Sequence, residues 1–254
     1  MKQEIIANFQ QHANTTPAAT QGMQVVEQAE LSWVDSGLNS DTFNVAFAHR
    51  GRSLPLSQIQ ALQSYYQKQQ AAFCLWVPED ELWPQLEQDL RQAGLRRQAI
   101  AVGMGMLSAE VPAIEIDTTG IEAVQTTEDL AAYASVIAAN WSPPDEDVQQ
   151  YYQRASEAYL SANSPSRLFI YRQEGEVIAT GELFAVDQQT AGIYGLCTLE
   201  THRRKGIATR MMSYIMQQAC QSGYEQLILH TSEAGLGIYH RLGFRTHTHL
   251  YEYA

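Results

Sequence analysis

The sequence predicts an α+β protein with a mixed central sheet flanked by helices. Short apolar runs alternate with amphipathic helical patterns along most of the 254-residue chain. In the second part of the chain the elements follow the order β-α-α-β-β-β-α-β-α-β, in which three strands joined by turns precede strands separated by helices. Together these two observations indicate an α+β fold built on a mixed sheet in the second part of the chain.

In the first part of the chain, apolar runs and breakers mark the elements. Pro78 ends a buried strand, Gly94 closes a helix, and Val111-Pro112 marks a connection before a second unit that begins at Ile114. The predicted elements are a helix and loop over residues 1–20, a strand over 72–77, a helix over 81–93 and a strand over 98–107.

The second part of the chain gives clearer patterns. Thr127 is the expected N-cap of a helix whose first turn carries Glu128 and Asp129, and Asp145 is the expected start of the next helix. Strands are predicted over residues 121–124, 168–171, 177–186, 193–198, 226–230 and 244–253, and helices over 127–139, 145–161, 206–221 and a short segment ending at 242–243.

Composition limits the class of function. The chain is 45% hydrophobic and 17% charged, as expected for a folded globular protein. Its 16 basic and 28 acidic residues give a net charge of −12, which argues against a nucleic-acid or anionic-membrane binder and would attract a cationic acceptor. We find no membrane-span pattern and no signal peptide, and three cysteines without a Cys-x-x-Cys motif favour a reduced, cytoplasmic setting.

The segment over residues 196–212 carries the strongest functional pattern. An apolar run ends, Arg203-Arg204-Lys205 follows, and Gly206 precedes an amphipathic helix. A strand, a glycine loop and a helix N-terminus together present backbone N–H groups to an anion. A solvated basic turn is the alternative, but no Walker A or Gly-x-Gly-x-x-Gly pattern competes for a phosphate. The segment therefore predicts a site for a phosphorylated ligand.

The motif Arg203-x-x-Gly206-x-Ala208 resembles the pyrophosphate loop of the GNAT superfamily of N-acetyltransferases, and residues 232–244 resemble the family's second cofactor-contacting motif. The resemblance covers residues ~115–254. It implies a GNAT fold whose sheet is V-splayed where the cofactor enters, acetyl-CoA as cosubstrate, and no metal. One departure is Glu200, where the family commonly has proline.

The resemblance also implies which residues contact coenzyme A. Backbone amides of residues 204–209 would hold the pyrophosphate, Arg203 and Lys205 would help to neutralise it, and the strand edge at residues 196–198 would pair with pantetheine. The expected cofactor-binding residues are Leu196, Cys197, Thr198, Arg203, Arg204, Lys205, Gly206, Ile207, Ala208, Thr209, Ser232 and Gly235.

Three residues are candidates for proton transfer. Tyr239 matches the family tyrosine that assists departure of the thiolate, although one of 13 tyrosines could also be a packing residue. A tight hairpin would place Glu182 opposite Tyr194, where a carboxylate with a raised pKa could take a proton from the amine. The alternative for Glu182 is a solvated face.

Two further features stand apart from proton transfer. His247-x-His249 lacks a third metal ligand nearby, and Trp141 is expected to shape the acceptor pocket.

A weak internal echo suggests two domains. Residues 90–96 and 239–245 both end a helix at glycine and lead into a strand, although such junctions are common. We expect a degenerate GNAT-like N-terminal domain without a cofactor loop over residues 1–112 (the N-terminal half) and a catalytic GNAT domain over residues 113–254 (the C-terminal half).

The predicted function is direct transfer of an acetyl group from acetyl-CoA to a primary amine of a small molecule, peptide or protein. Two alternatives stay open: a non-catalytic coenzyme-A-binding regulatory or interaction module, and a transferase that uses a longer acyl-CoA. The acceptor is left open, because acceptor pockets of this family lie in variable helices and loops.

Overall fold

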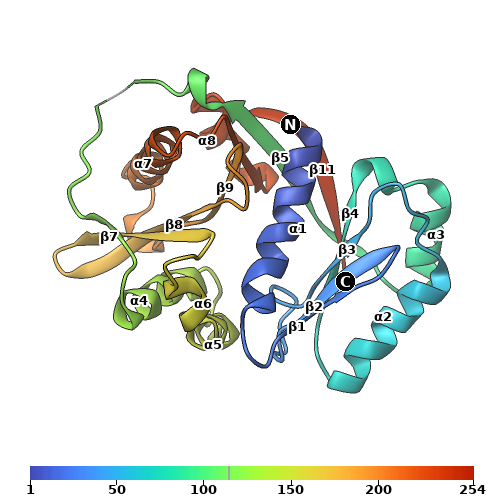
Figure 1. The fold of residues 1–254 in the computed structure, drawn as a ribbon. Helices are drawn as coiled ribbons and strands as arrows, with labels where there is room; N and C mark the ends of the chain where they lie inside the picture. The colour runs from blue at the N-terminus through green and yellow to red at the C-terminus, as the bar shows by residue number, and fades with distance from the viewer. Residues whose placement is uncertain (114) are drawn as a thin grey trace.

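One continuous mixed sheet forms the centre of the molecule in the computed structural model, which describes residues 1–113 and 115–254 (Figure 1). Ile114, where the second unit is expected to begin, lies outside the described residues. From one edge to the other, the strands are β1 (Gln24–Glu27), β2 (Leu31–Asp35), β3 (Val45–Ala48), β4 (Cys74–Pro78), β11 (Arg245–Tyr253), β5 (Arg97–Leu107), β10 (Gln226–Thr231), β9 (Thr190–Thr198), β8 (Glu176–Phe184), β7 (Ser166–Gln173) and β6 (Ile121–Ala123).

Helices cover both faces of this sheet. Figure 1 shows α4 to α6 on one side of β7 and β8, with α7 on the other side, and α1 across the middle of the molecule. The helices are α1 (Lys2–Ala18), α2 (Leu56–Gln69), α3 (Pro84–Gln92), α4 (Thr127–Ala138), α5 (Glu146–Arg154), α6 (Ser156–Leu160), α7 (Ile207–Gln221) and α8 (Leu236–Arg241). In the described residues, no helix is both long and apolar enough to cross a membrane.

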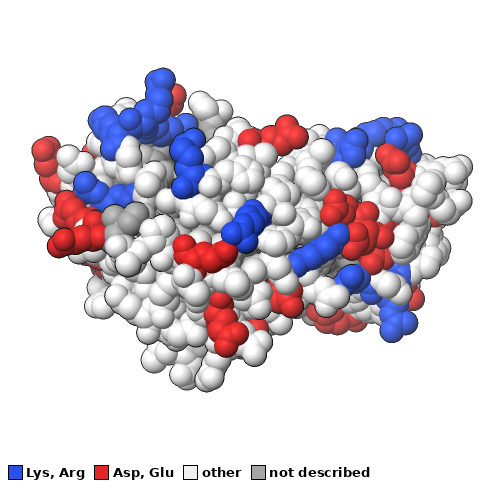
Figure 2. Space-filling view, turned by 90° about the horizontal axis from the view of Figure 1, so that it is seen from above, with Lys and Arg blue, Asp and Glu red and all other residues white. Residues whose placement is uncertain are grey.

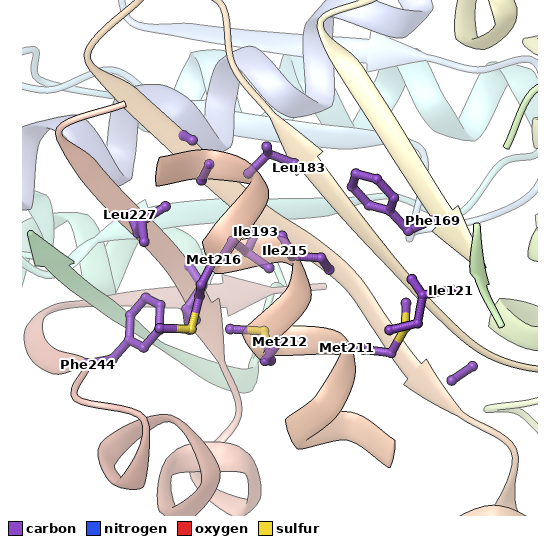
Figure 3. Close-up of a cluster of buried hydrophobic side chains, with 14 of the residues drawn as sticks. Ile121, Phe169, Leu183, Ile193, Met211, Met212, Ile215, Met216, Leu227 and Phe244 are labelled. Carbon is purple, nitrogen blue, oxygen red and sulfur yellow. The ribbon is translucent and has the colours of Figure 1, made fainter. Parts of the chain in front are cut away.

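The alternation of side chains along β7 explains why it is covered on both faces. Phe169 belongs to the core under α7, whereas Leu168 and Ile170 belong to the core under α4 to α6. Helix α7 closes the first core with Met211 and Ile215, which are fully buried and four residues apart on one helical face (Figure 3).

Helix α1 joins the two halves of the chain. Its residues Ile6 and Phe9 pack with Val45 of β3, and also with Phe184 of β8 and Tyr194 of β9. The amphipathic spacing of this helix therefore serves a core that the N-terminal and C-terminal halves build together.

The two halves exchange strands at the centre of the sheet. Strand β5 of the N-terminal half pairs antiparallel with β10, and β11 of the C-terminal half pairs antiparallel with β4. The exchanged strands also pair with each other, for example through Leu250 and Ala101. Each half thus completes its part of the sheet with a strand from the other, and the domain boundary at residue 112 stays a prediction.

The two strands that are exchanged follow helix ends of the same geometry. At the end of α3 the Leu95 N–H donates to the Leu90 carbonyl at 3.0 Å, and at the end of α8 the Phe244 N–H donates to the Tyr239 carbonyl at 3.0 Å. Gly94 and Gly243, which lie between, have φ of 91° and 98°. Both ends are Schellman motifs, so the internal echo in the sequence corresponds to a repeated local structure.

Three sequence-based details are wrong. The N-cap of α4 is Thr126, not Thr127, because the Thr126 hydroxyl accepts the Asp129 N–H at 3.1 Å. Helix α3 begins at Pro84 rather than residue 81, because residues 79–81 form a separate short 3₁₀ turn. The single helix expected over residues 145–161 is two helices, which meet at Ala155.

Candidate active site

The sheet opens between β9 and β10, as expected. These parallel strands are paired only from Thr190 to Gly192 on β9 and from Gln226 to Ile228 on β10. Beyond this point, Gly195 and Leu196 of β9 together oppose Gly181 of β8, and Gly195 has a φ of 56°. Two residues opposite one form a bulge that turns the strand. The β9 edge over residues 195–198 is therefore free of β10.

The loop that follows β9 forms an anion cradle. Arg204 and Gly206 have φ of 61° and 80°, so the chain turns sharply before α7 begins at Ile207. The first N–H groups of an α-helix have no partner within the helix, and its N-terminus carries partial positive charge. The start of α7 therefore offers donors to an anion. Glycine is favoured at position 206 by its positive φ and not by lack of space, because a Cβ there would meet no atom within 4 Å.

A cavity of about 770 Å³, which we call the loop cavity, lies between this cradle, β9 and α8. It is lined by every expected cofactor residue except Lys205 and Ser232. Residues that the sequence reasoning missed also line it, namely Asn140, His202, Thr231, Ala234, Ile238 and Arg241. Of these, Thr231 ends β10 directly before the predicted segment 232–244, and Ala234, Ile238 and Arg241 lie within that segment.

Arg203 ties the cradle to neighbouring elements. Its Nε donates to the Thr198 carbonyl at 3.0 Å, and its Nη2 donates to Asn140 Oδ1 at 3.3 Å. Its positive charge is thereby held beside the loop cavity. The face drawn in Figure 2 carries separate groups of Lys and Arg side chains rather than one broad basic field. Attraction of an anion to the loop cavity therefore depends on nearby cations such as Arg203 more than on the net charge.

Tyr239 lies in the loop cavity, where its phenol keeps its proton. The side chain belongs to α8 and packs edge-on against Phe244, with ring centroids 6.2 Å apart. Burial, with a smaller contribution from the Cys197 thiol, raises the pKa of Tyr239 to about 12. At neutral pH the residue is therefore an acid or hydrogen-bond donor rather than a phenolate.

A second cavity of about 350 Å³, the interface cavity, lies where the N-terminal and C-terminal halves meet. Asn140 and Cys197 line both cavities, and Asn140 Nδ2 lies 3.0 Å from Cys197 Sγ. The interface cavity is lined by Phe9, His12, Ala13, Thr42, Phe43, Val45, Ile137, Asn140, Trp141, Tyr151, Tyr152, Tyr159, Glu182, Tyr194, Gly195, Cys197 and His230. The two cavities thus meet at the bulged end of β9.

Glu182 faces the interface cavity, and the solvated-face alternative is wrong. Its pairing with Tyr194 across the β8–β9 hairpin matches the expected register. The residue is only 1% exposed. Oε1 accepts the Ser166 hydroxyl at 2.5 Å, and Oε2 lies 3.1 Å from His12 Nε2. A buried carboxylate with two polar partners is a candidate proton acceptor.

Tyr194 contacts Asn8 and His12 of helix α1. Its hydroxyl donates to Asn8 Oδ1 at 2.7 Å, and its ring stacks on that of His12 with centroids 3.7 Å apart. Burial and the Glu182 charge keep the pKa of Tyr194 well above its ordinary value. These contacts orient the His12 ring beside Glu182.

His12 and His230 are site residues that the sequence reasoning missed. His12 comes from α1, which the sequence analysis treated only as a polar helix. Its spacing from Ile5 and Phe9 on one helical face could have indicated that it is partly buried. His230 follows the apolar run of β10. Burial, and then the nearby His12, lower the pKa of His230 to about 4, so its ring is neutral at neutral pH.

The described residues contain no group of three or more His, Cys, Asp and Glu side chains that could hold a metal ion. The two histidines of the last strand illustrate this. His249 Nδ1 lies 2.8 Å from Glu79 Oε2, so this histidine contacts the N-terminal half.

Comparison with known proteins agrees with this architecture. Residues 133–244 match the model of the acetyltransferase (GNAT) family. None of the curated proteins matches the chain. Among solved structures, the fold is similar to that of a GCN5-related N-acetyltransferase from Kribbella flavida, with a TM-score of 0.69 and 16% identity over 98% of this chain and 95% of that one.

Two further structures extend the similarity over nearly the whole chain. A GCN5-related N-acetyltransferase from Sphaerobacter thermophilus has a TM-score of 0.62 and 16% identity, covering 100% of this chain and 92% of that one. A tandem GNAT protein of the clavulanic acid biosynthesis pathway has a TM-score of 0.59 and 12% identity, covering 98% and 92%. The chain therefore has a GNAT-like fold throughout, and within it residues 133–244 match the GNAT acetyltransferase family model.

Proposed function

We propose that this protein is an acetyl-CoA-dependent N-acetyltransferase that moves the acetyl group directly to a primary amine. The observation that carries the proposal is the meeting of two cavities at Asn140 and Cys197. One cavity holds an anion cradle and a protonated phenol, and the other holds a buried carboxylate. A donor and an acceptor bound in these cavities would meet at the bulged end of β9.

The loop cavity suits the donor. The N–H groups at the start of α7, together with Arg203 and Arg204, would bind the pyrophosphate. The open edge of β9 at residues 196–198 would pair with the pantetheine amides as an added strand does. Acetyl-CoA would supply the activated thioester, and the residues of this chain would bind it and transfer the protons.

Proton transfer is assigned to Glu182 and Tyr239. Glu182, with His12 against its second oxygen, accepts a proton from the ammonium of the acceptor. The amine nitrogen then forms a bond to the acetyl carbon, the bond from that carbon to sulfur breaks, and the nitrogen releases its second proton to solvent as the amide forms. Tyr239 donates its proton to the departing thiolate and regains one from solvent. Tyr194 positions His12 in this scheme and does not itself exchange a proton.

The direct test combines binding with turnover. Isothermal titration with acetyl-CoA measures donor binding, and thiol release with mass spectrometry of the amine measures transfer across a panel of primary amines. Donor binding followed by amine-dependent acetylation is the expected result. Failure to bind at millimolar acetyl-CoA would overturn the donor assignment. Tight binding without transfer to any amine would favour a regulatory module, and competition between acyl chain lengths separates acetyl transfer from longer acyl transfer.

A further inference from the structure

The interface cavity has an unusual balance of charge. Of the described residues that line it, none is Lys or Arg, and the single carboxylate is that of Glu182. His230 stays neutral because burial lowers its pKa to about 4. The only other titratable nitrogen base is His12, whose Nε2 already faces the Glu182 carboxylate at 3.1 Å. The cavity can therefore balance a positive charge and has no free cation for a negative one.

Aromatic side chains make up half of the other residues that line this cavity. Phe43 of the N-terminal half stacks on Tyr151 of α5 with centroids 3.8 Å apart, so the two halves meet ring to ring at the cavity. Tyr152, Tyr159 and Trp141 add further faces. Burial raises the pKa values of the three tyrosines above their ordinary value, so they stay uncharged. Such walls favour flat or apolar groups and the faces of cations.

The size of the cavity selects among amines. A volume of about 350 Å³ lies at the lower end of the range for small-molecule sites. A compact amine fits within this volume, whereas a folded protein or a long peptide is larger than the cavity.

We infer that the interface cavity takes a compact primary amine whose ammonium is its only charge and whose remainder is apolar or aromatic. This inference rests on the proposed function and names the class of acceptor. An acceptor that also carries a carboxylate would bury that group beside Glu182 without a cationic partner. The N-terminal half then sets acceptor choice through Phe9, His12 and Phe43, whereas the C-terminal half holds the donor.

A matched set of probes tests this. 2-Phenylethylamine and phenylalanine share one body and differ by the carboxylate, and phenylalanine amide replaces that charge with a neutral group. We expect kcat/KM for acetylation of 2-phenylethylamine to exceed that of phenylalanine by at least about 100-fold, with the amide between them. Equal or better acetylation of phenylalanine, or of a tripeptide, would overturn the inference while leaving N-acetyl transfer intact.

A charge added at the cavity tests the same argument from the protein side. Thr42 lines the cavity from an exposed position, so Thr42→Arg should fold normally and bring a cation to the wall. In this variant, we expect the ratio of kcat/KM for 2-phenylethylamine to kcat/KM for phenylalanine to fall about tenfold. Thr42→Gln, of similar length without charge, should keep the original preference. An unchanged preference in Thr42→Arg would contradict the charge argument.

A binding measurement separates failure of this inference from failure of the proposed function. With coenzyme A present, isothermal titration calorimetry measures the affinity of the protein for 2-phenylethylamine and for phenylalanine. Absence of transfer to every amine would refute the proposed function. Binding of phenylalanine as tight as that of 2-phenylethylamine would refute only the acceptor class.

Discussion

His12 and Glu182 come from opposite halves of the chain, yet His12 Nε2 lies 3.1 Å from Glu182 Oε2. A carboxylate beside a histidine fixes the ring orientation and the tautomer of that histidine. The Tyr194 ring stacks on the other side of the same imidazole. The proton-accepting end of the proposed site therefore depends on α1, although the cofactor loop lies entirely in the C-terminal half.

The first prediction concerns Glu182. Glu182→Gln keeps the size of the side chain but removes the base, so kcat/KM for amine acetylation should fall at least about 100-fold. Acetyl-CoA binding, measured by titration, should stay unchanged. The control is Glu176→Gln, an exposed carboxylate on the same strand β8. Equal turnover in both variants would remove Glu182 from the reaction.

The second prediction concerns Tyr239. Tyr239→Phe should bind acetyl-CoA normally but lose about 100-fold in kcat, because it lacks the proton for the thiolate. Since the pKa of Tyr239 is raised to about 12, the phenol stays protonated through neutral and mildly alkaline pH. This group should therefore cause no loss of wild-type kcat up to about pH 10.

The matched control for that variant is Tyr224→Phe. Tyr224 packs against the core under α7 and lines neither cavity. Steady-state kinetics of the pair separate loss of the phenol from a general packing defect. Full turnover by Tyr239→Phe would exclude it as the acid.

The third prediction uses the two glycines that flank α7. Gly206 and Gly223 have φ of 80° and 85°, and a Cβ would meet nothing within 4 Å at either. Replacement by Ala should therefore cost each variant a similar 1–2 kcal/mol, roughly, of unfolding free energy. Only Gly206→Ala distorts the anion cradle, so only it should weaken acetyl-CoA binding, by about tenfold in titration. Equal affinities would argue against the cradle as the pyrophosphate site.

The fourth prediction is a pH dependence of stability. His230 in the folded protein binds its proton near pH 4, whereas an unfolded histidine does so near about 6.5. The unfolded chain therefore takes up more protons between these values, and stability falls as the pH drops from about 6.5 to about 4. The loss should reach up to about 3 kcal/mol.

Denaturant unfolding of His230→Phe checks this, because phenylalanine keeps a ring against Phe9, whose centroid is 4.1 Å from that of His230. The variant should show a flatter decline in that pH range than the wild type. His240→Gln, at an exposed position, should decline like the wild type. A parallel decline in His230→Phe would contradict the assignment.

The fifth prediction is one acetyl-CoA per chain. In the N-terminal half, the loop between β3 and α2 corresponds by element order to the cradle between β9 and α7. Its Gly51 N–H already donates to Glu81 Oε1 at 2.9 Å, and Glu81 is 4% exposed. The protein's own carboxylate thus already takes an N–H group of this loop, which lies before α2. Titration should give a stoichiometry near one, and two equivalents would contradict it.

Local sequence signals predicted what depends on local structure. The Glu182–Tyr194 register followed from a short hairpin, and the end of α3 followed from Gly94. The sequence could not decide between Thr126 and Thr127 as the N-cap. Both are threonines, which can cap a helix, and only the extended backbone at Thr126 identifies it as the cap. His12 was missed because its partner Glu182 lies 170 positions away on strand β8, and no spacing within α1 encodes that contact.

The strand exchange was also beyond local signals. The apolar patterns of β5 and β11 indicate that these strands are buried, but not which neighbour each one pairs with. Both would read the same in two separate sheets. The pairing of β5 with β10 and of β11 with β4 emerges only from the packing of the whole chain.

That exchange has a consequence for how the protein is made. Strand β4 has no β11 beside it until residues 245–253 have been synthesised, so the N-terminal half cannot complete its sheet as the chain emerges. Its exposed edge must wait for a contact of long sequence separation, which slows folding and leaves the nascent chain open to wrong pairing. We therefore expect slow refolding, because neither half can close the centre of the sheet alone.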